Sequence, residues 1–281
     1  GGVQYTEFPW LYSFEADGGD LEGVMAHDRA YARSVGLQVG IAARGAGWVL
    51  AVPRGTNGLD LLGFHDDLAA DGERRHDPPQ TREAALASDG ARVGLVTIAG
   101  ENPDNQDALD FALVDVLLSR DVPDEGADVL ADAIGSDTVE AAAITAGHGG
   151  FLVAGVARRH GLGVQLFDAI TGERRVAHRF DDVELPARVR ATATASGFAV
   201  VVTHTSDDFL FTWVDVLLFG ADGAAHGRTR VLELPQEVHV QFQLEDVGAA
   251  AVGDRLHLVL VPGLQTGLEH LEVDVGRCPA P

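Results

Sequence analysis

The chain has 281 residues, of which 46% are hydrophobic, so it can bury a sizeable core and is not a disordered protein. Its 43 acidic residues outnumber its 20 basic ones, and the formal net charge of −23 argues against a nucleic-acid partner, which needs a basic face. All apolar runs are far shorter than the roughly 20 residues that a membrane-spanning helix requires, so no membrane span is expected. The charge predicts a solvated acidic surface, and the lack of lysine is typical of bacteria with GC-rich genomes.

The first predicted element is a strand over residues 8–14. Aromatic residues occupy every second position, which is the period of a strand with one aromatic face: Phe8, Trp10, Tyr12 and Phe14. Pro9 cannot donate a hydrogen bond to a neighbouring strand, so this strand is expected at a sheet edge. We interpret the aromatic stripe as a packing face; the alternative is a stacking platform for a sugar or another planar ligand.

Downstream, one order of segments recurs along the chain. A segment rich in small residues precedes a short, continuously apolar run, and a further strand-like segment follows it. The apolar runs span residues 47–52, 92–99, 150–157, 197–204 and 254–261. In a β-propeller the innermost strand of each blade lies near the central axis, where small side chains fit, and the second strand is buried between neighbouring blades. The third strand is expected to be half exposed, with alternating burial.

Turns that end in glycine mark the same period. They recur about every 50 residues, which is the range of propeller blades, at Gly18, Gly72, Gly126, Gly172, Gly223 and Gly276. Glycine suits these turns because tight hairpins need a positive φ angle. Helix signals are nearly absent: the most helix-like stretch, residues 81–90, falls where an innermost strand is expected.

Residues 166–180, with the sequence LFDAITGERRVAHRF, resemble the repeats of quinoprotein-like and related β-propellers. In that family a strand ending in Leu-x-Asp-Ala is followed by Thr-Gly and an outer strand. The present sequence departs from the family at the outer strand, where His178 stands in place of the usual tryptophan. The resemblance implies a propeller architecture for the whole chain, but it does not identify any functional residue in this sequence.

We therefore predict an all-β protein with a single β-propeller domain over residues 1–281, built from five four-stranded blades. The N-terminal segment, residues 1–34, is expected to close the ring by adding a strand to the last blade, because an open ring leaves two unpaired edges. Residues 18–34 are an alternative source of that strand, and six blades are the alternative count. The expected blades span residues 35–80, 81–136, 137–182, 183–235 and 236–276, followed by a tail at 277–281.

The loop at residues 101–110 is the sharpest candidate for a metal site. It gathers oxygen-bearing side chains, which suit a hard cation such as Ca²⁺, at Glu101, Asp104, Asn105, Asp107 and Asp110. The spacing does not match an EF-hand, and the alternative is a solvated acidic loop. Ca²⁺ is the cofactor that the sequence suggests.

The connections between second and third strands, and those between blades, emerge on one face of a propeller around its central channel. This loop face is the expected ligand site. His204 lies near Asp207 and Asp208, an arrangement that suits a general base or a metal ligand. Arg158 and His160 are candidates for binding an anion on the same face.

No catalytic fingerprint accompanies this architecture. We expect a non-catalytic recognition or scaffold propeller, extracellular, periplasmic or at the cell surface, that binds a glycan or a partner protein, alone or in a larger assembly. The alternative is a glycoside hydrolase or lyase whose carboxylates meet at the channel mouth. The innermost strands begin mostly with valine, alanine and glycine, although Glu83, Glu140 and Asp246 lie close. Cys278 is the only cysteine, which excludes an internal disulfide.

Overall fold

The structure is a computed structural model. It describes residues 6–7, 10–13, 22–25, 31–32, 40–43, 45, 47–53, 58–67, 69–76, 81–100, 107–114, 127–128, 139–157, 161–183, 187–205, 211–235, 244–262 and 268–276. All secondary-structure elements assigned in these ranges are β-strands, which confirms an all-β fold for the described residues. No helix long and apolar enough to cross a membrane occurs in them.

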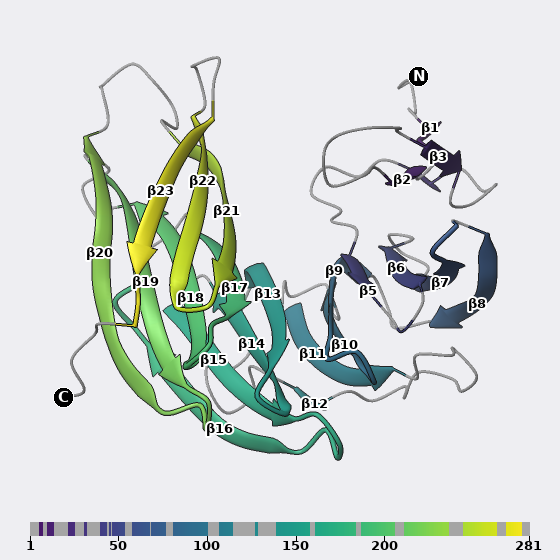
Figure 1. Ribbon diagram of the computed structural model, residues 1–281, viewed down its shortest axis with the longest axis horizontal. Coiled ribbons are helices and arrows are strands. Elements are labelled where there is room, and N and C mark those ends of the chain that lie inside the picture. Colours follow the sequence, from purple (N-terminus) through teal and green to yellow (C-terminus); the bar gives the residue numbers. More distant parts are fainter. Residues whose placement is uncertain are drawn as a thin grey trace.

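Strands that follow one another in the chain form five antiparallel sheets (Figure 1). The first sheet contains β5 (Gly40–Ala43), β6 (Gly47–Pro53), β7 (Leu59–His65) and β8 (Ala70–His76). The second contains β9 (Thr81–Ser88), β10 (Val93–Gly100), β11 (Asp107–Val114) and β12 (Ala127–Asp128). The third contains β13 (Val139–Gly147), β14 (Gly150–Ala157), β15 (Gly161–Asp168) and β16 (Arg174–Phe180). The fourth contains β17 (Ala187–Ala193), β18 (Gly197–Thr205), β19 (Phe211–Gly220) and β20 (Ala225–Pro235). The fifth contains β21 (Leu244–Val252), β22 (Arg255–Pro262) and β23 (Glu269–Asp274).

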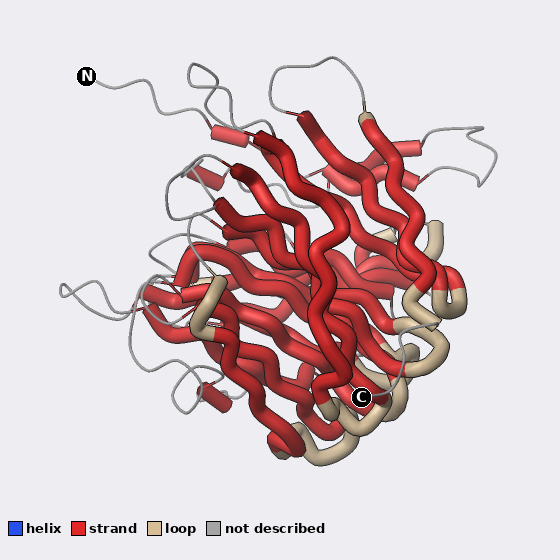
Figure 2. Tube along the Cα trace, turned by 90° about the vertical axis from the view of Figure 1, so that its left-hand side faces the viewer, coloured by secondary structure: helices blue, strands red, loops and turns tan. Residues whose placement is uncertain are grey.

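The first strand of each sheet is its innermost one. β5 contacts β9, β9 contacts β13, β13 contacts β17 and β17 contacts β21, so the innermost strands stand side by side in chain order. Figure 1 shows the sheets following one another around a common centre, and Figure 2 shows the described turns gathered at one end of the strands. This radial order is the one that stacked blades require.

Burial explains why the middle strands are so apolar. β14 and β18, the second strands of the third and fourth sheets, are buried at every residue because neighbouring sheets cover both of their faces. Contrary to expectation, the third strands β7 and β15 are also buried, except at one end. A fourth strand covers the outer edge of each. The second and fourth sheets cover the two faces of β15, and the second sheet covers one face of β7. Burial alternates as expected on two other third strands, β11 (over residues 109–112) and β23, and it also alternates on the fourth strand β16.

Two local predictions are confirmed. Residues 81–88 form strand β9 rather than a helix. Gly172 and Gly223 follow tight turns and adopt the positive φ angle that such turns need, 73° and 84°. Gly72 also has a positive φ, 101°, but it lies inside strand β8, at a register irregularity, and not in a turn. Gly276 is the exception among the described members of the series, because its φ lies outside that region.

The turn after β15 is held by its aspartate. Asp168 Oδ1 accepts hydrogen bonds from the backbone N–H groups of Ile170, at 2.7 Å, and Thr171, at 2.8 Å. The bond from Thr171, the Arg175 guanidinium and the bond from Ile170 together hold the pKa of Asp168 below its usual range. This is the physical basis of the Asp-Ala-x-Thr-Gly sequence, since the carboxylate satisfies turn amides that no strand pairs.

His178 fills the place where related repeats have tryptophan. Its Nε2 lies 2.8 Å from the carbonyl oxygen of Gly223, and its ring lies 5.6 Å from the ring of Phe219. The side chain therefore joins the outer strand of the third sheet to the fourth sheet by one hydrogen bond and one ring contact.

Turns at the end opposite the loop face also join neighbouring sheets. His148 Nε2 lies 2.9 Å from the carbonyl oxygen of Thr194, which links the first hairpin of the third sheet to that of the fourth. Asp254 Oδ1 accepts hydrogen bonds from Ser196, at 2.9 Å from the backbone N–H and 2.8 Å from the hydroxyl, which links the fourth sheet to the fifth. These bonds fix the angle between consecutive sheets on that side.

The N-terminal strands pair with one another. β1 (Thr6–Glu7) pairs with β4 (Tyr31–Ala32), and β2 (Trp10–Ser13) pairs with β3 (Glu22–Met25). Among the described strands, β23 pairs with β22 alone. Closure of the ring by residues 8–14 beside β23 therefore stays a prediction. So does the role of the aromatic stripe, because Phe8 and Phe14 lie outside the described residues and only the backbone of Trp10 and Tyr12 is described.

Gly94→Ala is expected to lower the free energy of unfolding by about 1–3 kcal/mol through overpacking. A Cβ atom at Gly94 on β10 would lie 2.7 Å from Phe151 Cδ1 and 2.9 Å from Ile144 Cδ1, where the second and third sheets pack. Gly248→Ala is the matched control, since its Cβ would lie 3.7 Å from Val259 Cβ, an ordinary contact. Urea denaturation measures both variants, and an equal loss in the two would contradict the tight packing at Gly94.

Candidate functional site

Three of the innermost strands carry a charged residue near their start, on the loop face. Glu83 is the third residue of β9, Glu140 the second residue of β13 and Arg188 the second residue of β17. Glu83 and Glu140 are half-buried and Arg188 is exposed, so all three are accessible to solvent. Because the innermost strands contact one another in order, these residues gather around one end of the fold.

β-bulges recur at the same place. The strand registers leave one extra residue at the start of an innermost strand in the second, third and fifth sheets: Arg82, Glu140 and Glu245. Each of these extra residues is charged. Bulges occur preferentially at barrel rims and beside binding sites, where they redirect a side chain that regular pairing would hold in the sheet.

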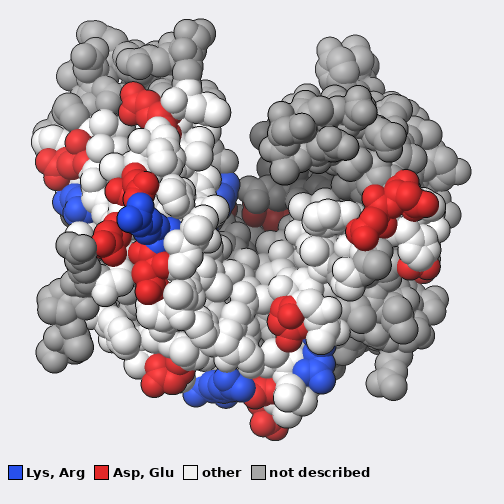
Figure 3. Space-filling view, in the orientation of Figure 1, with Lys and Arg blue, Asp and Glu red and all other residues white. Residues whose placement is uncertain are grey.

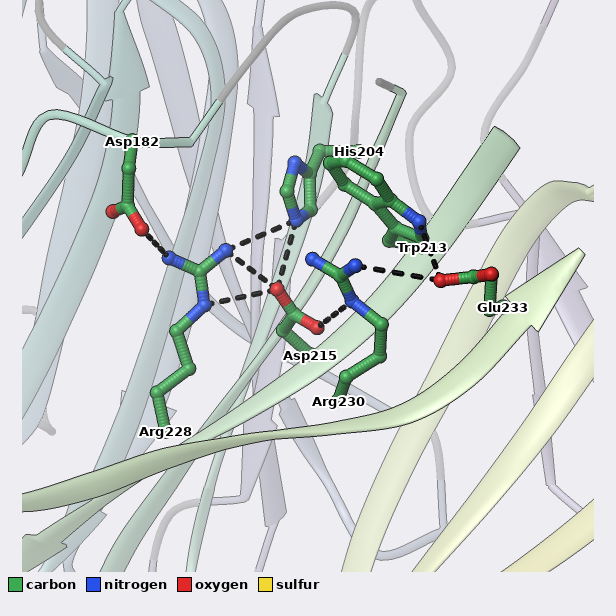
Figure 4. A network of polar contacts seen from close by, with 7 residues as sticks. All are labelled: Asp182, His204, Trp213, Asp215, Arg228, Arg230 and Glu233. Carbon is green, nitrogen blue, oxygen red and sulfur yellow. Dashed lines mark hydrogen bonds and ion pairs between the residues drawn. The ribbon is translucent and has the colours of Figure 1, made fainter. Parts of the chain in front are cut away.

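A buried polar network lies on the loop side of the fourth sheet (Figure 4). At its centre is Asp215 on β19, a third strand, whose side chain is only 1% exposed. Its Oδ2 atom lies 2.9 Å from His204 Nε2 on β18 and accepts a hydrogen bond from Arg228 Nε on β20 at 2.9 Å. Its Oδ1 atom accepts a hydrogen bond from Arg230 Nε at 3.1 Å. Both carboxylate oxygens are thus committed to cations or to an imidazole.

The network continues to a neighbouring sheet and to the surface. Arg228 Nη1 donates to Asp182, just after β16, at 2.6 Å, so the network bridges the third and fourth sheets. The Arg230 guanidinium lies 3.7 Å above the ring of Trp213, and Trp213 Nε1 donates to Glu233 at 3.1 Å. A bulge in β20 opposite Val214 and Asp215 brings Arg230 into register with Asp215.

Electrostatics decides what Asp215 does chemically. Burial raises the pKa of its carboxyl, but the hydrogen bonds from His204, Arg230 and Arg228 outweigh burial and bring the pKa well below its usual range. A general acid needs a raised pKa, so this carboxylate is suited to holding strands together rather than to proton transfer. His204 Nε2 lies 2.9 Å from Asp215 Oδ2 and 3.1 Å from Arg228 Nη2, while Nδ1 is buried with no hydrogen-bond partner among the described residues.

The structure describes one side chain of the predicted ligand face, that of His204. Its predicted neighbours in a ligand or metal site lie outside the described residues: Asp207, Asp208, Arg158 and His160. The same holds for three residues of the predicted calcium loop, Glu101, Asp104 and Asn105, while Asp107 is described only as the first backbone position of β11. In the described part of the chain no group of three or more histidine, cysteine or acidic residues is placed to hold a metal ion.

Sequence reasoning missed the partners of His204. Asp215 lies more than ten positions away and inside an apolar strand, and the two arginines belong to the following strand. The available signal was a charged residue in a buried run, which requires partners. The same signal occurs in the first sheet, where Asp60 on β7 is fully buried and lies opposite Arg75 in the register of β8, as Asp215 lies opposite Arg230.

Asp215→Asn is expected to lower the free energy of unfolding by about 3–5 kcal/mol at neutral pH, because the substitution leaves two arginines beside a neutral amide. The folded-state pKa of Asp215 is depressed, so its contribution is present above about pH 4, the ordinary pKa of an unfolded aspartate, and is lost as the pH falls toward the folded-state pKa. Urea denaturation from neutral pH to about pH 3 should therefore show wild type and variant converging.

Glu173→Gln, at an exposed glutamate in the turn after β15, is the control and should change stability by less than about 0.5 kcal/mol. A gap between wild type and Asp215→Asn that stays constant across this pH range would contradict a role for the ionised carboxylate.

Comparisons with known proteins bear on the fold. A structure of the Dos1 propeller has a TM-score of 0.50 at 10% identity and covers 94% of this chain and 73% of that chain. A structure of the mitotic checkpoint complex has a TM-score of 0.51 at 12% identity, with 94% and 68% covered. The SapL1 lectin in complex with α-methyl fucoside has a TM-score of 0.50 at 15% identity, with 85% and 77% covered. No protein-family model and no curated protein matches the chain by sequence. At these identities the likeness concerns the fold alone, and the fold is that of a β-propeller.

Proposed function

We propose that this protein is a non-catalytic recognition propeller that binds a partner protein or a glycan on its loop face, at the ends of the innermost strands. The five sheets are its five blades, and residues 1–281 form one propeller domain. The observation that carries the proposal is the recurrence of charged β-bulge residues there, at Arg82, Glu140 and Glu245. A bulge that only relieved strain would not need a charged residue each time.

The hydrogen bonds and ion pairs of the network around His204 and Asp215 favour a binding function over a catalytic one. The carboxylate of Asp215 is bonded to three partners and buried, so the network fixes the position of β18, β19 and β20 below the loop face. A rigid platform lowers the entropy cost of binding a ligand. Glu140 and Arg188, near the starts of the contacting innermost strands β13 and β17, carry opposite charges and suit a ligand that offers both donors and acceptors.

The proposal is tested by screening the wild-type protein on a glycan array and on a peptide array. Glu140→Ala and Arg188→Ala are each expected to raise the Kd for any ligand identified on the arrays about tenfold, because each removes a charged contact at the binding face. Glu173→Ala, in a turn at the other end of the strands, is the matched control and should bind as wild type does. The proposal would be overturned if the wild-type protein bound nothing on either array, or if neither substitution lowered its affinity for the ligand found.

A glycoside hydrolase is the second candidate, and one observation favours it. Glu83 and Glu140 are half-buried acidic residues near the starts of β9 and β13, two innermost strands in contact, and glycoside hydrolysis uses a pair of carboxyl groups. In this case the wild-type protein should release nitrophenol from aryl glycosides, and Glu83→Gln and Glu140→Gln should each lower kcat about a hundredfold or more. Absence of turnover across the series would leave binding as the function.

A further inference from the structure

The fifth sheet has an exposed third strand. In the other sheets with full burial patterns the third strand is buried, as in β7, β15 and most of β19. β23 is exposed at Glu269, His270, Glu272 and Asp274 and half-buried at the two residues between them. β22 is its partner on one side, and the backbone donors and acceptors of the other side, here termed the β23 edge, have no partner strand among the described residues.

The β23 edge is acidic. Three of the six residues of β23 are carboxylates, Glu269, Glu272 and Asp274, and the chain as a whole carries a net charge of −23. Arg255 on β22 pairs with Glu272 at 3.1 Å, and no ion pair to Glu269 is formed within the described part of the chain. Figure 3 shows several acidic side chains on this side of the molecule, at the left of the view, interspersed with arginines.

The register of the other sheets indicates what pairs with such a strand. In the fourth sheet Val202 on β18, Asp215 on β19 and Arg230 on β20 lie side by side across the strands. In the first sheet the same places are held by Val52, Asp60 and Arg75. Each row lies five residues after the start of the second strand, at Gly197 and Gly47.

In the fifth sheet the same row contains Leu260, five residues after Arg255, and then Glu269, and it ends at the open edge. An acidic residue thus stands where Asp60 and Asp215 stand, and the position of the arginine is vacant among the described strands. The fourth strands of this chain are rich in arginine, with Arg174, Arg175 and Arg179 on β16 and Arg228 and Arg230 on β20. A fourth strand for the fifth sheet is therefore expected to be basic.

The N-terminal strand of this chain fits the edge poorly. Residues 6–14 contain Glu7 and no arginine, so they offer no positive charge to Glu269. The alternative segment, residues 18–34, contains Arg29 and Arg33, but its strands β3 and β4 already pair with β2 and β1. β2 is also already paired with β3 on one of its edges. Charge complementarity favours a strand from another molecule.

We propose that the β23 edge binds a basic, extended segment of a partner protein, which adds a fourth strand to the fifth sheet and sets an arginine or lysine against Glu269. Backbone hydrogen bonds to β23 supply affinity, and the carboxylates of the edge select a basic sequence over a neutral one. This surface is separate from the ends of the innermost strands and stands independently of the function proposed for them.

Fluorescence anisotropy with a labelled peptide of sequence Thr-Arg-Val-Arg-Val-Thr-Arg tests the proposal on the whole protein. Wild type is expected to bind it saturably, and Glu269→Arg to bind it about tenfold more weakly or worse. The same peptide with alternate backbone amides N-methylated keeps its charge but cannot pair as a strand, and should also bind about tenfold more weakly. Hydrogen exchange should show the amides of β23 becoming protected when the unmodified peptide is added.

Glu173→Arg makes the same charge change in a distant turn and should retain wild-type affinity. An equal loss in Glu173→Arg and Glu269→Arg would show attraction by net charge alone and overturn the proposal. Equal binding of the N-methylated peptide would do the same. Failure of wild type to bind, with β23 amides already protected in the free protein, would assign the edge to a strand of this chain.

Discussion

The stacking of each sheet against its neighbours is the constraint on which the rest of this structure depends. The strands β14, β15 and β18 are apolar on both faces, and they stay buried only while a sheet lies on each side. Stacking also brings the innermost strands together in chain order, so that residues far apart in the sequence meet at one end of the fold. The loop-face residues and the fixed turns at the opposite end both follow from this arrangement.

Much of this architecture could be predicted from the sequence, because short local patterns of small, apolar and turn-forming residues indicate where the strands lie. The strand β9 was predictable although TREAALAS is rich in helix formers, since its place in the repeat demands a strand. Burial of the third strands β7 and β15 was not predictable from alternation, because it depends on the fourth strand and on the neighbouring sheets. The partners of His204 were equally hidden: Asp215 lies near it only through the register of β18 and β19, and no local signal fixes that register.

Several arginines of this acidic chain compensate buried or neighbouring carboxylates. On β20 they reach over the edge of β19 to a buried aspartate, and one of them also reaches Asp182 beside the third sheet. A buried carboxylate alone would be costly, but with two guanidinium groups and an imidazole around it the charge is compensated and the strands are held in one register. Charge is used here for specificity inside a fold whose stability comes from apolar burial.

The two ends of the stack are not equivalent. In the first sheet, Leu50, Leu62 and Phe64 point away from the second sheet, yet they are 5%, 4% and 2% exposed, so that outer face is covered. In the fifth sheet, the face turned away from the fourth sheet carries Arg255 and Val259, which are exposed, while Leu256 and Leu258 on the other face are fully buried. Within the described part of the chain, the stack ends on one side in a polar face, and its last sheet has three strands where the other four sheets have four, so a further strand can add contacts there. The sequence of that last strand, acidic where the equivalent strands of two other sheets face arginine, then restricts which strands it accepts.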